Sequence, residues 1–65
     1  MDVQKLKGAI VAGGYTQATL AKELGIQPDT MYKKMKRGVF NTDEALKMIE
    51  ILNIDNPVEI FLPEK

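Results

Sequence analysis

The stretch TQATLAKELGIQPDTMYKKMKRG, residues 16–38, decides the fold of this chain. Its first half carries apolar residues at the spacing of one helical face, namely Leu20, Ala21 and Leu24. Thr16 lies just before them and is a favoured N-cap residue, while Gly25 supplies the positive φ at which helices often end. We therefore predict a short helix over residues 17–24 that is closed by a tight turn.

The second half of the stretch predicts another helix, over residues 28–36. Pro28 suits its first position, where a missing N–H costs no hydrogen bond, although Gln27 is not a favoured N-cap. Met31 and Met35 lie about one turn apart on the side expected to be buried. Basic residues crowd the C-terminal half before Gly38, where they suit the helix dipole: Lys33, Lys34, Lys36 and Arg37.

Three further helices are expected around this pair. One follows Asp2 as N-cap and runs to about residue 12, with Gly13 and Gly14 as a left-handed stop. Its inward residues are Val3, Leu6 and Ile10. Another follows Asn41, which forms a capping box with Glu44, and runs to about residue 52. Its inward residues are Ala45, Met48, Ile49 and Leu52.

A short last helix is signalled by Asn56 as N-cap, Pro57 at the first position and Glu59 as the capping-box acid. No segment alternates between apolar and polar residues over the length of a strand. The sequence therefore predicts an all-α fold, a compact bundle of five short helices that forms a single domain over residues 1–65.

Composition removes most other classes of protein. The chain has no cysteine and no histidine, so disulfides, the usual zinc sites and histidine acid/base chemistry are not expected. We expect no enzyme, no cofactor and no metal. No apolar run approaches the roughly 18 residues that span a bilayer, and the first residues lack a signal-peptide core, which favours a cytoplasmic protein without a membrane partner.

The charge of the chain is zero overall but unevenly placed. Residues 15–40 carry five basic side chains and two acidic ones, a net charge of +3. Residues 41–65 carry two basic and six acidic ones, a net charge of −4. Such asymmetry orients a small protein on a polyanion, although solvated helix faces often carry charge runs as well.

Two short helices separated by a glycine turn have the layout of a helix-turn-helix, in which the second helix enters the DNA major groove. An ordinary helical hairpin has the same outline. The segment TQATLAKELGI, residues 16–26, closely resembles the motif core of the lambda-repressor-like superfamily, which includes phage Cro and repressor proteins and the xenobiotic-response-element family. The segments 30–40, 44–45, 52–54 and 57–61 are similar to small regulators from phages and prophages of low-GC Gram-positive bacteria.

The resemblance implies a sequence-specific regulator that binds double-stranded operator DNA, usually as a homodimer. In the family, the glutamine matching Gln17 contacts phosphate and braces the recognition helix. The exposed face of that helix, where bases would be read, is expected to hold Gln27, Asp29, Thr30, Lys33 and Lys34. Among these, Lys33 suits guanine, Gln27 adenine or a phosphate, and Asp29 cytosine. Backbone contacts are expected from Tyr15, Thr16, Lys36 and Arg37, where Thr16 begins the phosphate-facing helix end.

Two features depart from the family pattern. Pro28 stands where many members carry a polar base reader, and Met31 and Met35 are four residues apart where many members have three. The resemblance therefore leaves open, by one residue, which side chains of the second helix would face the DNA bases.

Two alternatives also stay open. The chain could be a protein-binding module, such as an antirepressor, that keeps the fold without binding DNA. The apolar residues near the C-terminus could form a dimer surface or close the monomer core: Ile54, Val58, Ile60, Phe61 and Leu62.

Overall fold

Five helices follow one another along the chain, for which a computed structural model describes residues 1–62. They are α1 (Val3–Ala12), α2 (Gln17–Leu24), α3 (Pro28–Arg37), α4 (Thr42–Ile51) and α5 (Pro57–Phe61). Every regular element in the described part is a helix. The predicted all-α bundle of five helices, with a helix-turn-helix formed by the second and third, is confirmed, and α3 ends one residue later than expected.

Side-chain caps explain where most helices begin. The Asp2 carboxylate accepts a hydrogen bond from the Lys5 amide at 3.1 Å and starts α1. The Thr16 hydroxyl accepts one from the Thr19 amide at 3.1 Å and starts α2. Asn41 starts α4 through the predicted capping box with Glu44. The local sequence alone therefore fixes these three boundaries.

The beginning of α5 differs from the prediction. Asn56 occupies the N-cap position, but its side chain makes no capping hydrogen bond, and its backbone lies outside the usual extended region. The carboxylate of Glu59 is bound elsewhere, because it accepts a hydrogen bond from Lys5 Nζ at 2.9 Å. The hydrogen bond between Lys5 of α1 and Glu59 of α5 thus takes the place of the expected capping box.

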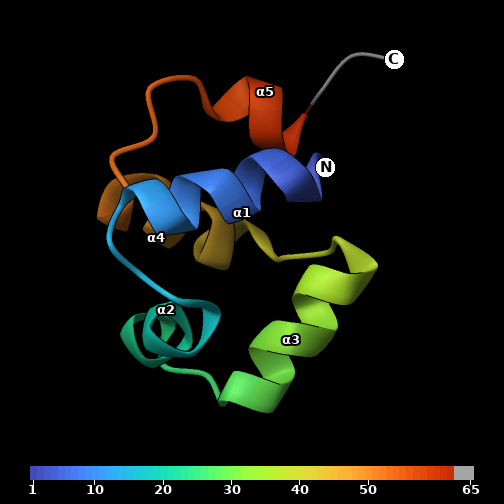
Figure 1. The fold of residues 1–65 in the computed structure, drawn as a ribbon. Coiled ribbons are helices and arrows are strands. Elements are labelled where there is room, and N and C mark those ends of the chain that lie inside the picture. The colour runs from blue at the N-terminus through green and yellow to red at the C-terminus, as the bar shows by residue number, and fades with distance from the viewer. Residues whose placement is uncertain (63–65) are drawn as a thin grey trace.

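Helix α1 lies at the centre of the arrangement, with α5 on one side, α4 behind it and the α2–α3 pair on the other side (Figure 1). The first residues pair with the last helix, since the Asp2 amide donates to the Ile60 carbonyl at 2.7 Å. The most extensive contact between two helices joins α2 and α3. This pair therefore forms one packed unit on the side of α1 opposite α5.

The core draws on all five helices. Its buried members are Leu6, Ile10, Leu20, Ala21, Leu24, Met31, Met35, Met48, Leu52 and Ile60. These residues include the predicted stripes of α2 and α3 and, from that of α1, Leu6 and Ile10, whereas Val3 is only partly buried and packs against the core. Ile60 closes the monomer core and Phe61 and Ile54 pack against it, whereas Val58 and Leu62 are exposed. Ile60, Phe61 and Ile54 thus follow the alternative in which the C-terminal apolar residues close the monomer core.

Among residues 1–62, no helix combines the length and the apolar character that crossing a membrane would need.

Candidate nucleic-acid interface

The turn between α2 and α3 fixes the angle at which α3 is held. Gly25 adopts φ 75°, a left-handed conformation that favours glycine, and the Ile26 amide then donates to the Ala21 carbonyl at 3.0 Å. Ala21 is fully buried and Ile26 packs against the core from the turn. The small side chain of Ala21 permits the close approach of the two helices, so that α3 packs closely on α2.

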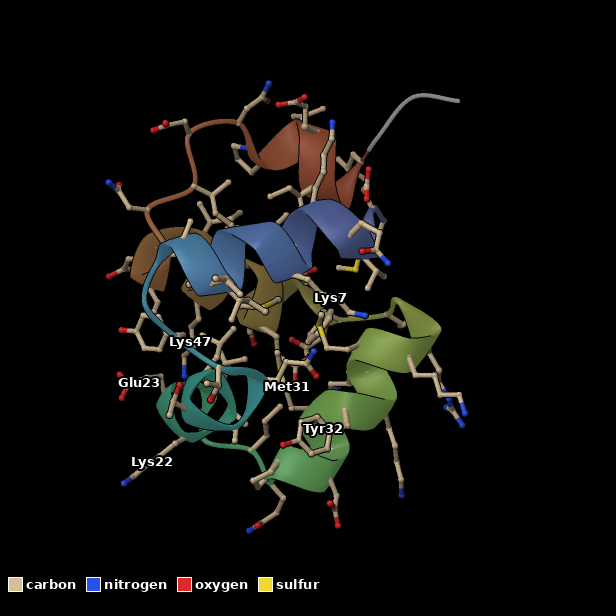
Figure 2. The ribbon with its side chains drawn as sticks, in the orientation of Figure 1. Lys7, Lys22, Glu23, Met31, Tyr32 and Lys47 are labelled. Atoms are coloured by element: carbon tan, nitrogen blue, oxygen red, sulfur yellow. The ribbon has the colours of Figure 1, made fainter. Side chains whose placement is uncertain are left out.

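Helix α3 has one buried and one exposed face. Met31 and Met35 are 0% and 3% exposed, which turns the opposite face to solvent. Figure 2 shows Tyr32 on the open surface of α3 and Met31 on its inner side. The exposed face and the adjoining turn carry Gln27, Asp29, Lys33, Lys36 and Arg37. Three of these side chains are cations that only donate hydrogen bonds, which suits phosphate oxygens and guanine edges.

The beginning of α2 is capped by a mutual pair of threonines. Thr16 Oγ1 accepts from the Thr19 amide at 3.1 Å, and the Thr16 amide donates to Thr19 Oγ1 at 2.8 Å. Thr16 is exposed, while Tyr15 packs partly against the core and Gln17 is half-buried. The helix end predicted to face phosphate is therefore preorganised by its own side chains.

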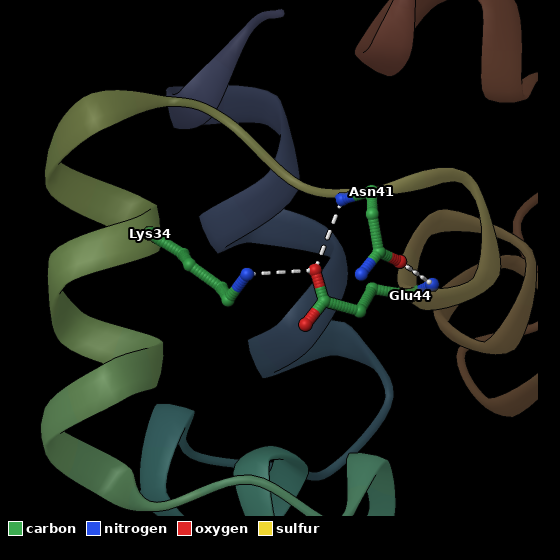
Figure 3. A network of polar contacts seen from close by, with 3 residues as sticks. All are labelled: Lys34, Asn41 and Glu44. Atoms are coloured by element: carbon green, nitrogen blue, oxygen red, sulfur yellow. Dashed lines mark hydrogen bonds and ion pairs between the residues drawn. The ribbon is translucent and has the colours of Figure 1, made fainter.

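A polar network connects the C-terminal half of α3 with the start of α4 (Figure 3). Lys34 Nζ lies 3.0 Å from Glu44 Oε1, and the Asn41 amide donates to the same oxygen at 3.0 Å. The Glu44 amide in turn donates to Asn41 Oδ1 at 2.8 Å. The Glu44 side chain is 11% exposed and the Lys34 side chain 28% exposed. One carboxylate oxygen thus serves both the cap of α4 and the ammonium of Lys34.

The predicted site residues fall into two groups. Those that lie exposed are Thr16, Gln27, Asp29, Lys33, Lys36 and Arg37. Those that are half-buried are Tyr15, Gln17, Thr30 and Lys34.

The expected exposure of Lys34 and Thr30 is wrong. Lys34 lies three residues after Met31 and next to Met35, so it stands at the edge of the buried stripe and faces α4. Thr30 lies one turn before Lys34 along the same edge. Both line a surface depression together with Lys33, Arg37 and Val39.

The sequence pattern predicts only one of the two contacts that the Glu44 side chain makes. Glu44 is expected as a capping-box acid, and in the structure its carboxylate also forms an ion pair with Lys34. The pattern carried a signal for this pairing. Glu44, Met48 and Leu52 are spaced four apart, which puts an acid on the buried stripe of α4. Lys34 is the corresponding charge beside the stripe of α3, so each charge is explained by the other.

The charge of the surface differs between the two sides of the molecule. Most exposed acids lie on α4 and α5 and in the loop between them, namely Asp43, Glu50, Asp55 and Glu59, while Glu23 is exposed on α2 and Asp29 at the start of α3. Glu59 hydrogen-bonds Lys5, and this contact together with its charge raises the pKa of the Lys5 ammonium. The exposed surface of α3 therefore carries an excess of cations and that of α4, α5 and their loop an excess of acids, as the uneven charge of the sequence predicts.

Compared with known proteins, the chain matches no family model, no curated protein and no solved structure.

Proposed function

We propose that this protein is a sequence-specific, double-stranded DNA-binding regulator of transcription, a small phage-repressor or Cro-like protein that reads operator DNA with α3 in the major groove. The observation that carries the proposal is the exposed cationic face of α3, with Lys33, Lys36 and Arg37, on a helix that the turn at Gly25 packs against α2. The helix-turn-helix layout and the resemblance of residues 16–26 add support.

Base reading is assigned to the exposed residues near the start and middle of α3. Lys33 is suited to guanine O6 and N7, Gln27 to adenine or a phosphate, and Asp29 to cytosine N4. Lys36 and Arg37 follow on the same exposed face and would hold the DNA backbone. Thr16 and Gln17 would meet phosphate at the start of α2, where unsatisfied amides and the helix dipole favour an anion.

A homodimer on DNA follows from the size of the reading element. A helix of ten residues such as α3 is about 15 Å long, well under one helical turn of DNA of about 34 Å. Two copies would supply two half-sites and enough buried surface for tight binding. The exposed side chains of Leu46, Val58 and Leu62 are apolar contacts available for such a dimer. A regulator of this class acts in the cytoplasm, where bacterial DNA lies.

The test is a binding selection on random duplex DNA followed by titration of the selected sequence. Selection should yield two half-sites about 10 base pairs apart from centre to centre. Lys33→Ala should weaken binding to that sequence by about fivefold to 160-fold for each half-site, since one good base contact contributes about 1–3 kcal/mol. Lys47→Ala is the matched control, because Lys47 is an exposed lysine on α4 that Figure 2 shows away from α3.

Two results would count against the proposal. Wild-type protein that binds no duplex even at low salt would favour a protein-binding module. Equal effects of the Lys33 and Lys47 substitutions would show that α3 is not the reading element.

A further inference from the structure

Among residues 1–62, Glu44 is the only buried residue with a charged side chain. Burial of a carboxylate costs solvation energy unless donors replace the lost water. Here the replacement is an amide from Asn41 and the ammonium of Lys34, both 3.0 Å from Oε1. The carboxylate is therefore held in place from its own helix and cannot swing out without breaking the cap of α4.

The consequence falls on Lys34. Its neighbour Lys33 is exposed on the outer face of α3, whereas the Lys34 side chain is drawn towards α4 and is 28% exposed (Figure 3). A lysine stem is long enough to reach either solvent or the carboxylate. Glu44 thus determines which of these two positions the ammonium occupies.

We propose that Glu44 is a positioning residue that withholds Lys34 from the phosphate backbone and so limits sequence-independent DNA affinity, an inference that rests on the function proposed above. Non-specific binding arises almost wholly from cations that neutralise phosphates and release counterions. With Lys34 paired, the cations exposed on α3 are Lys33, Lys36 and Arg37. Release of Lys34 adds a fourth.

The first experiment compares two adjacent lysines. Binding to a random duplex of about 20 base pairs is followed by fluorescence anisotropy between about 50 and 200 mM salt. On random duplex no particular base is offered to Lys33, so its ammonium is expected to neutralise a phosphate. Lys33→Gln should then reduce the magnitude of the slope of log affinity against log salt by about 0.9 for each bound protomer, the value of one lost phosphate contact. Lys34→Gln should leave the slope as in the wild type, because that ammonium contacts Glu44 and not phosphate.

The second experiment frees the lysine instead of removing it. Glu44→Gln keeps a side chain able to cap α4 but removes the charge that holds Lys34. Its slope should steepen by about 0.9 for each bound protomer, and its affinity for random duplex should rise by about eightfold per protomer at 0.1 M salt. Glu50→Gln changes the net charge equally at an exposed position of α4 and should leave the slope unaltered. The double variant Glu44→Gln with Lys34→Gln should return to the wild-type slope.

Circular dichroism confirms that each variant is folded before its titration. Should Lys34→Gln not fold, Glu44→Gln and the double variant decide the question, since neither leaves a buried charge unpaired. The inference is overturned if Lys34→Gln flattens the slope as Lys33→Gln does, or if Glu44→Gln behaves as Glu50→Gln. In both cases the wild type still binds DNA and the proposed function stands. A wild type that binds no duplex overturns both.

Discussion

The Lys34–Glu44 pair should stabilise the fold asymmetrically, so that loss of the lysine costs more than loss of the acid. At the observed 3.0 Å and an effective dielectric constant of about 20, the gross attraction is about 5 kcal/mol, most of which offsets lost hydration. Breaking exposed pairs costs up to about 1 kcal/mol and breaking buried ones about 3–5 kcal/mol. Exposures of 28% and 11% place this pair between those limits.

Lys34→Met keeps most of the lysine stem but leaves the Glu44 carboxylate buried with one donor fewer, and we expect a loss of about 2 kcal/mol. Glu44→Gln leaves Lys34 free to move into solvent and retains the cap, so its cost should stay below about 1 kcal/mol. Urea unfolding followed by circular dichroism measures both values. For a domain of this size the corresponding fall in Tm is about 8–16 °C for Lys34→Met and a few degrees for Glu44→Gln.

The matched control is Lys33→Met, the same change at the exposed neighbouring position, which should alter stability by no more than about 0.5 kcal/mol. Equal losses for Lys33→Met and Lys34→Met would show that the pair contributes nothing. A larger loss for Glu44→Gln than for Lys34→Met would refute the reasoning that the carboxylate is the group unable to escape burial.

Three further predictions concern other parts of the fold. Gly8→Ala should raise the free energy of unfolding by about 0.5–1 kcal/mol, because Gly8 lies inside α1 with open space around an added Cβ. Gly25→Ala should lower it by about 1–2 kcal/mol, because an alanine is strained at φ 75°. Urea unfolding should show midpoints that shift in opposite directions for the two variants. Met31→Ala should cost about 2–5 kcal/mol by leaving a cavity between α2 and α3, and a smaller loss in thermal unfolding would mean that the core collapses around the site. The hydrogen bond from Lys5 to Glu59 and the charge of Glu59 raise the pKa of Lys5 above its ordinary value of 10.5. The contribution of this contact to the free energy of unfolding is therefore full below that pH and is lost as the pH rises through the higher pKa of the folded state. Lys5→Met should remove this alkaline loss from urea midpoints measured as the pH is raised through that pKa.

The helices could be predicted because the signals that set them are local. Thr16, Asn41 and Asp2 cap through residues three positions later, and Gly25 and Gly38 stop helices by their own backbone conformation. Between Gly13 and Gly14, it is Gly14 that takes the left-handed conformation. These features depend on a few neighbouring residues and little on the rest of the fold.

The errors arose where a distant residue competes with a local signal. Glu59 has the spacing of a capping-box acid, but Lys5 of α1 binds its carboxylate, so Asn56 is left without that partner. Lysine is usually a surface residue, but Lys34 occupies a position on α3 that faces Glu44. Each case needs the three-dimensional approach of two helices, which local propensity does not contain.

The shared oxygen of Glu44 joins two structural roles that are usually separate. Because Oε1 accepts from the Asn41 amide and from Lys34 Nζ, the start of α4 and the C-terminal half of α3 are bound to the same atom. A shift of α4 is therefore felt by α3 at the end that carries Lys36 and Arg37, while the turn at Gly25 fixes the other end. In the DNA complex proposed above, a helix held at both ends would lose little conformational freedom on binding, and this would lower the entropic cost of a specific complex.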